Sequence, residues 1–129
     1  MNGPSHRILE VLSRYRMPLT DEKALQVEIA KVLMSCDLPH QREVDLGGGD
    51  IVDFMVLRPG LSLQKGTAPG VAIEVKIGGS RRAIFRQLER YCAHDAVEEI
   101  ILATAVYMGL PETIGGKPAH VLPLGRAWL

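Results

Sequence analysis

The stretch from residue 51 to residue 56, Ile-Val-Asp-Phe-Met-Val, is the feature that most restricts how this chain folds. Alternate residues of a strand point to opposite faces of a sheet. Both faces of this strand are apolar, and Asp53 is its only charge. Such a strand lies inside a covered sheet, where a carboxylate is unfavourable by several kcal/mol unless it is paired or binds a metal. The sequence therefore predicts an α/β fold in which Asp53 has a partner.

A second strand, residues 71–77, reads Val-Ala-Ile-Glu-Val-Lys-Ile. Its four β-branched residues share one face, whereas Glu74 and Lys76 share the other with Ala72. We expect Asp53, Glu74 and Lys76 to converge on one face of the sheet. The alternative is an ion pair of Lys76 with Asp53 or Glu74 that only neutralises buried charge, and the spacing is compatible with both.

The remaining pattern predicts the element order αα-βββ-α-β-β. Helices are expected over 5–16 with Ser5 as N-cap, over about 21–36 with Thr20 or Asp21 as N-cap, and over 81 to about 94. Strands are expected over 41–46, 51–57, 71–77, 99–107 and 120–124, with a hairpin turn at 47–49, a looser segment at 58–70 and a loop at 111–118. This order implies an α/β fold with a central mixed sheet flanked by helices.

The length of 129 residues fits one domain, 1–129, with an N-terminal helical extension (1–19), a core (20–107) and a C-terminal loop and short strand (108–129). No apolar run approaches the ~20 residues that cross a bilayer, and the N-terminus lacks the apolar stretch of a signal peptide. Only two cysteines occur, which argues against a disulfide framework. We expect a cytoplasmic protein with no membrane partner.

Two carboxylates and a lysine on one sheet face form a set of groups suited to phosphate chemistry. Mg²⁺ usually binds one or two protein carboxylates and keeps several waters. It lowers the pKa of a bound water and stabilises charge on a phosphoryl oxygen, and a nearby lysine can position that water or bind the phosphate. The glycines at 47–49 and 115–116 lack the context of a phosphate-binding loop, so no nucleotide cofactor is expected.

These residues resemble the PD-(D/E)XK nuclease superfamily, which has the restriction-endonuclease-like fold. The resemblance covers about residues 20–107 and rests on three motifs: Gly-Asp-Ile-Val-Asp at 49–53, Ile-Glu-Val-Lys at 73–76 and Gln-Leu-Glu-Arg-Tyr at 87–91. One departure is Val52, which stands where the nominal motif has proline.

The resemblance implies a Mg²⁺-dependent deoxyribonuclease, with Mn²⁺ able to substitute and DNA as the expected substrate. It implies that Asp53, Glu74 and the carbonyl of Val75 bind the metal. Lys76 would position the attacking water, and Gln87 would contact phosphate or water beside it. A homodimer is compatible with so small a domain.

The superfamily also places an acidic residue on the helix before the sheet. Glu22 lies within roughly 30° of the centre of the apolar stripe of that helix, whereas Glu28 lies nearly a quarter-turn away. We therefore expect Glu22 to face the sheet, although it could instead serve only the helix dipole. Glu43 is a further candidate, because the hairpin register cannot be read from the sequence.

Four arginines follow the second motif within ten residues: Arg81, Arg82, Arg86 and Arg90. They are predicted to bind nucleic acid, which a net charge of zero does not exclude; the alternative is a solvated helix face. Tyr91 is expected to be half-buried with its hydroxyl in water. The four histidines are scattered, and none is assigned a role.

Two other functions remain compatible with the sequence. One is a non-catalytic nucleic-acid-binding or assembly module that keeps the nuclease fold. The other is an α/β interaction domain whose charged cluster is purely structural.

Overall fold

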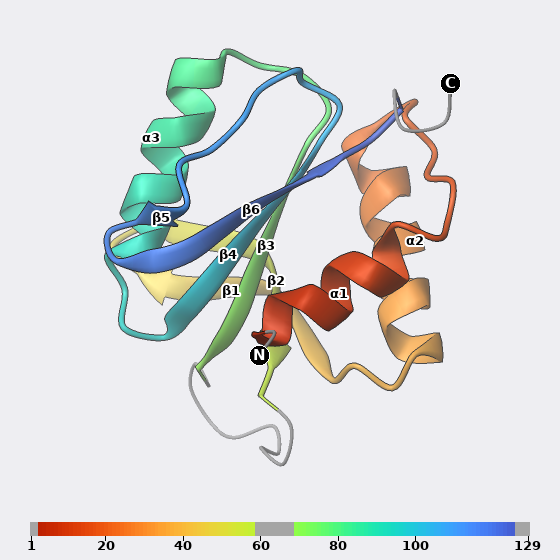
Figure 1. Ribbon diagram of the computed structural model, residues 1–129, viewed down its shortest axis with the longest axis horizontal. Helices are drawn as coiled ribbons and strands as arrows, with labels where there is room; N and C mark the ends of the chain where they lie inside the picture. The colour runs from red at the N-terminus through yellow and green to blue at the C-terminus, as the bar shows by residue number, and fades with distance from the viewer. Residues whose placement is uncertain (1–2, 59–68, 126–129) are drawn as a thin grey trace.

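The computed structural model describes residues 3–58 and 69–125, which form three layers (Figure 1). A mixed sheet lies in the middle, with α1 and α2 on one face and α3 on the other. This confirms the expected α/β domain with a mixed sheet between helices. The helices are α1 (Pro4–Leu12), α2 (Glu22–Ser35) and α3 (Arg81–Cys92), and the strands are β1 (His40–Gly47), β2 (Asp50–Leu57), β3 (Gly70–Lys76), β4 (Val97–Thr104), β5 (Thr113–Ile114) and β6 (Lys117–Pro123).

The strand order across the sheet is β1-β2-β3-β4-β6-β5. β1, β2 and β3 are antiparallel, whereas β3, β4 and β6 run parallel, with α3 making the crossover between β3 and β4. β2 has a neighbour on each side, as its apolar faces predicted. The carboxyl ends of β3 and β4 meet at one edge of the sheet, because Lys76 is paired with Thr104.

One short strand, β5, was not predicted from the sequence. Residues 111–118 were expected to be a loop, but β5 pairs with the start of β6. The connecting residues, Gly115 and Gly116, have φ angles of 58° and 79°. Two consecutive left-handed residues form the tight turn that suits a two-residue hairpin, and glycine adopts this conformation without steric strain.

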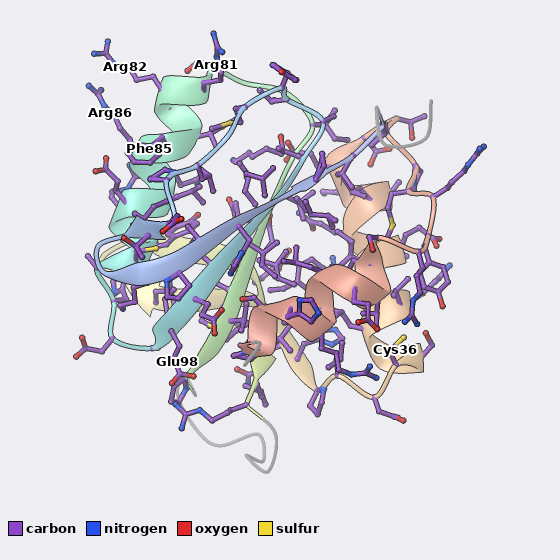
Figure 2. The ribbon with its side chains drawn as sticks, in the orientation of Figure 1. Cys36, Arg81, Arg82, Phe85, Arg86 and Glu98 are labelled. Carbon is purple, nitrogen blue, oxygen red and sulfur yellow. The ribbon has the colours of Figure 1, made fainter. Side chains whose placement is uncertain are left out.

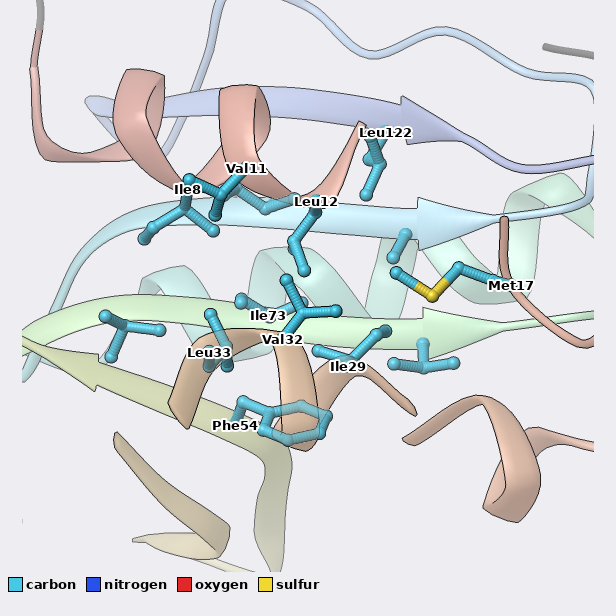
Figure 3. Close-up of a cluster of buried hydrophobic side chains, with 14 of the residues drawn as sticks. Ile8, Val11, Leu12, Met17, Ile29, Val32, Leu33, Phe54, Ile73 and Leu122 are labelled. Atoms are coloured by element: carbon cyan, nitrogen blue, oxygen red, sulfur yellow. The ribbon is translucent and has the colours of Figure 1, made fainter. Parts of the chain in front are cut away.

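Apolar side chains cover both faces of the sheet. Figure 3 shows the cluster beneath α1 and α2, where helix residues meet side chains of β2, β3 and β6. The β-branched residues of β3 enter this cluster, whereas Ala72 packs on the opposite face beneath α3, so the predicted alternation of β3 is confirmed. The labelled members of the first cluster are Ile8, Val11, Leu12, Met17, Ile29, Val32, Leu33, Phe54, Ile73 and Leu122.

The first two helices begin differently from each other. Ser5 was expected to cap α1, but Gly3 is the N-cap and Ser5 is buried in the first turn. The reason is Pro4, which has no N–H to satisfy and a φ suited to the first helical position. α1 also ends at Leu12, before the expected Arg16. For α2, Asp21 is the N-cap and accepts a hydrogen bond from the Ala24 N–H at 2.7 Å, which confirms one of the two expected caps.

Most of the expected loose segment, residues 58–70, lies outside the described residues. Within residues 3–58 and 69–125, no helix combines the length and the apolar character needed to cross a bilayer.

Gly70 provides a test of the strand arrangement. A Cβ atom at this position would overlap the carbonyl oxygen of Val56 on β2, so the backbone would have to shift. We expect Gly70→Ala to lower the free energy of unfolding by about 2 kcal/mol. Gly78→Ala is the control, because its Cβ would meet no atom within 4 Å, and it should change stability by less than about 0.5 kcal/mol. Urea unfolding measures both, and equal effects would contradict this close approach of β2 and β3.

Candidate active site

The candidate site lies where β2 and β3 stop pairing through their backbones. That pairing ends with Phe54 opposite Ile73. Beyond this row the N–H of Asp53 donates to Oε1 of Glu74 at 3.1 Å, and the N–H of Val75 donates to Oδ2 of Asp53 at 2.8 Å. The two carboxylates thus satisfy backbone donors that would otherwise be left unpaired between the strands. We call this opening, with Asp53 and Glu74 between its arms, the β2–β3 fork.

The backbone of the neighbouring strand is also irregular at this row. The β1–β2 register places Glu43 across from Asp53, and Glu43 has a left-handed φ of 50°. Phe54 packs beneath α1 and α2, whereas Val52, two residues earlier, packs beneath α3. The strand therefore reverses its alternation at Asp53, and the carboxylate reaches sideways to β3. A non-glycine residue in the left-handed region is unfavourable by about 1 kcal/mol or more. Glu43 was a further candidate for the additional acid, and the register places it in the same row as Asp53. Its side chain is exposed, however, so its carboxylate does not lie in the fork.

Glu74 is the most buried charged group of the fork, at 3% exposure. Its Oε2 lies 3.6 Å from Nζ of Lys76. The hydroxyl of Tyr91 lies 3.3 Å from the same Oε2 and 2.8 Å from the carbonyl oxygen of Ile51, so its one proton has two acceptors within reach. Glu74 and Lys76 therefore meet on the α3 side of the sheet, as the strand pattern predicted.

The expectation for Tyr91 was wrong. Its side chain is 2% exposed, and its hydroxyl faces Glu74 and β2 instead of water. Tyr91 follows Gln87 by one helical turn, which was visible in the sequence. What the sequence did not show is that two acceptors on β2 and β3 lie opposite that flank of α3.

The surroundings of the fork disfavour the ionised form of both of its carboxyl groups. Burial, together with the nearby Asp53 carboxylate, raises the pKa of Glu74 to about 8. Burial also raises the pKa of Asp53, and the hydrogen bond from Val75 opposes that rise only in part. Lys76 favours the ionised form of both acids, but one partly exposed ammonium does not balance two carboxylates. A bound cation would relieve this excess of negative charge.

The backbone around Lys76 is held from two other elements. The Thr104 hydroxyl donates to the Lys76 carbonyl at 2.7 Å, and the N–H of Ala105 donates to the same oxygen at 3.1 Å. From the other side, the N–H of Ile77 donates to Oε1 of Glu22 at 3.0 Å. Thr104 was not predicted from the sequence as a residue of the site, because the strand was expected to continue to Tyr107. β4 ends at Thr104, whose hydroxyl also accepts the N–H of Val106 as the chain turns.

The two acids of α2 lie as helical geometry predicted. Glu22 reaches the end of β3 through its bond to Ile77. After burial and the other contacts of Asp53, the charge on Glu22 adds to the rise of the Asp53 pKa. Glu28 instead pairs with Lys31 at 3.2 Å on the exposed side of the helix. The structure therefore brings Glu22, and not Glu28, to the fork.

A pocket of about 410 Å³ lies beside Lys76, and we call it the Lys76 pocket. Gln87 lines this pocket with Lys76, as do Arg86 and Arg90. Figure 2 shows Arg81, Arg82 and Arg86 pointing away from the sheet, and of these three Arg86 lines the pocket. Arg81 and Arg82 are exposed and do not line it. The arginine cluster is thus divided between the pocket and the outer surface of α3.

The donor groups of the fork decide which metals suit it. Within residues 3–58 and 69–125, no three His, Cys, Asp or Glu side chains are grouped so as to hold a metal ion. Asp53 and Glu74 offer two carboxylates beside the Val75 backbone, which fits Mg²⁺ because this ion keeps several waters.

Comparison of the chain with family models, with curated proteins and with solved structures found no match.

The raised pKa of Glu74 gives a pH-dependent stability in the absence of metal. Between its ordinary value of 4.5 and the folded-state value of about 8, folded Glu74 holds a proton that the unfolded chain has released. The free energy of unfolding should therefore fall as pH rises through this range. Urea unfolding in EDTA measures the slope. Glu74→Gln should remove most of it, whereas Glu28→Gln should keep it; an unchanged slope in Glu74→Gln would show that another group titrates.

Proposed function

We propose that this protein is a metal-dependent nuclease that hydrolyses phosphodiester bonds of DNA. The observation that carries the proposal is the β2–β3 fork, in which the buried carboxylate of Glu74 and the part-buried carboxylate of Asp53 lie together with Lys76 beside a basic pocket. The motif resemblance to the PD-(D/E)XK superfamily supports the same assignment. The restriction-endonuclease-like identity of the fold is part of this proposal, and the three-layer mixed sheet is compatible with it.

In the proposed reaction, Asp53, Glu74 and the Val75 carbonyl would hold Mg²⁺, or Mn²⁺ in its place. The ion, when bound, would lower the pKa of a water and stabilise charge on the phosphoryl oxygens. Lys76 orients the attacking water, because its backbone is held by Thr104 and its ammonium lies 3.6 Å from Glu74. Gln87 and the pocket arginines bind substrate phosphate beside it.

The water oxygen bonds to phosphorus as the bond from phosphorus to the 3′ oxygen breaks. The proton lost by the water goes to solvent, and the leaving 3′ oxygen gains a proton. The products are a 5′-phosphate and a 3′-hydroxyl.

A second function, a nucleic-acid-binding module without catalysis, is favoured by one observation. Both carboxylates of the fork already accept backbone N–H groups, which is what a purely structural acid pair would do. The two functions differ in what Lys76 does, because a lysine that only neutralises charge is not needed for bond cleavage.

Nicking of supercoiled plasmid in Mg²⁺ or Mn²⁺ tests the proposal. We expect wild type to nick DNA and to melt at a higher temperature with metal than in EDTA, since the ion binds the folded state. Lys76→Ala should lose nicking while keeping the metal-induced rise in Tm, because lysine supplies no ligand atom. Asp53→Ala should lose both effects. Nicking by Lys76→Ala at the wild-type rate, or no nicking by wild type with either metal, would reject the nuclease assignment.

Glu22 and Glu28 form a matched pair for testing the helix acid. Glu22→Gln keeps an oxygen that can accept the Ile77 N–H, so stability should stay within about 1 kcal/mol of wild type. Loss of its charge beside the fork should slow nicking by about tenfold or more. Glu28→Gln should change neither quantity, because Glu28 is paired with Lys31 away from the site. Loss of activity in Glu28→Gln alone would contradict the role assigned to Glu22.

A further inference from the structure

The Lys76 pocket is lined by basic and amide side chains without a carboxylate. Lys76 comes from the end of β3, while Arg86, Gln87 and Arg90 come from successive turns of α3. The remaining lining residues are small or apolar: Gly78, Gly79, Ser80, Ala83 and Ile84. An anion is the ligand that such a lining favours, and arginine side chains suit phosphate oxygens in particular.

Arg90 differs from the other arginines of α3 in having an anchor. Its Nε donates to Oδ1 of Asp50 at 3.3 Å. The imidazole Nε2 of His94 lies 2.8 Å from the other oxygen of the same carboxylate. The bond to Asp50 uses one of the five N–H donors of the guanidinium, so the terminal amino groups can serve a ligand. Arg90 is therefore held in place by Asp50 while its other N–H donors remain available to a ligand.

The anchor itself is well supported. Asp50 is only 15% exposed, and the hydrogen bond from His94, with Arg90 beside it, lowers the pKa of its carboxyl. The carbonyl of His94 in turn accepts a hydrogen bond from Lys117 at 2.8 Å. Asp50 begins β2, whereas His94 follows α3, so the anchor also joins the β1–β2 hairpin to this helix.

The main effect of these hydrogen bonds is to orient the Arg90 side chain, and their contribution to stability is small. The Arg90 side chain is 57% exposed, and exposed ion pairs contribute little to stability. A flexible arginine loses rotamer freedom when it binds a ligand, and this loss of entropy weakens binding. An arginine that is already held loses less, so the same contact with a phosphate binds more tightly.

We propose that the Lys76 pocket is a phosphate subsite, and that Asp50 and His94 are positioning residues that hold Arg90 at it. The identity of the ligand rests on the proposed nuclease function: it is a backbone phosphate of the nucleic acid, next to the bond that is cleaved. The affinity of the pocket for phosphate does not depend on catalysis, since it follows from the side chains that line it.

An NMR titration of the full chain with inorganic phosphate, in EDTA and without DNA, tests the subsite directly. The Nε–Hε signal of Arg90 and the amide signals of Gly79 and Ser80 should shift and saturate together. The Nε–Hε signal of Arg82, which lies outside the pocket, should not follow that curve. No saturable shift, or an equal response from Arg82, would overturn the proposal.

Asp50→Asn separates anchoring from simple electrostatics. Removal of a negative charge near the pocket should tighten phosphate binding if charge alone matters. If Asp50 orients Arg90, phosphate binding should weaken instead. The expected change is about threefold, because the ligand must then immobilise the Arg90 side chain itself. Arg90→Gln should weaken it further, and Arg82→Gln is the control that should leave it unchanged. Tighter binding by Asp50→Asn would overturn the positioning role; if this variant fails to fold, His94→Gln makes the same comparison from outside the pocket.

Binding of a DNA duplex that lacks terminal phosphates, measured in EDTA, distinguishes a backbone phosphate from free phosphate. Arg90→Gln should reduce the salt dependence of duplex binding by about one counterion, whereas Arg82→Gln at most weakens it elsewhere on the surface. An unchanged slope in Arg90→Gln would overturn the backbone assignment. A protein that binds phosphate here but never nicks DNA would refute the nuclease alone, and nicking without a saturable phosphate response would refute the subsite alone.

Discussion

The hydrogen bond from the Val75 N–H to the Asp53 carboxylate is the contact on which the arrangement of the site depends. It replaces backbone pairing where β2 and β3 separate, and the bond from Asp53 to Glu74 complements it. Without these side-chain acceptors, the N–H groups of both strands would be buried without partners. The same two bonds therefore join the two strands where their backbones separate and hold the two carboxylates side by side.

This arrangement is a source of local instability that the rest of the fold supports. The buried acid Glu74 and the part-buried acid Asp53 have one lysine near them, and the adjacent row of β1 contains Glu43 in a left-handed conformation. Such features persist only where the surrounding structure is firm. Here the support comes from the two apolar clusters and from β2 lying inside the sheet. Local departures from ideal structure of this kind occur preferentially at sites of function.

Much of the fold was predictable, because periodicity reports directly on burial. The alternation in β3 placed Glu74 and Lys76 on the face of Ala72, and the apolar stripe of α2 placed Glu22 toward the sheet. Contacts between distant segments were not predictable. Tyr91, Thr104 and the Asp50–His94 pair acquire their partners only when strands and helices assemble. Two features were not predicted for local reasons. Pro4 moves the start of α1 ahead of Ser5, and the glycines at 115 and 116 form a hairpin turn where only a loop was expected.

The hydrogen bonds that hold the backbone on either side of Lys76 depend on the assembly of distant elements. The Thr104 and Glu22 bonds span 28 and 55 residues of chain, and neither can form until β4 and α2 have docked. The acid pair spans about 21 residues within one antiparallel unit and closes a shorter loop. Shorter loops close at a smaller loss of entropy. The acid pair thus needs only β2 and β3, whereas the Lys76 backbone is held on both sides only once β4 and α2 are in place, so the geometry of Lys76 reports on completion of the whole domain.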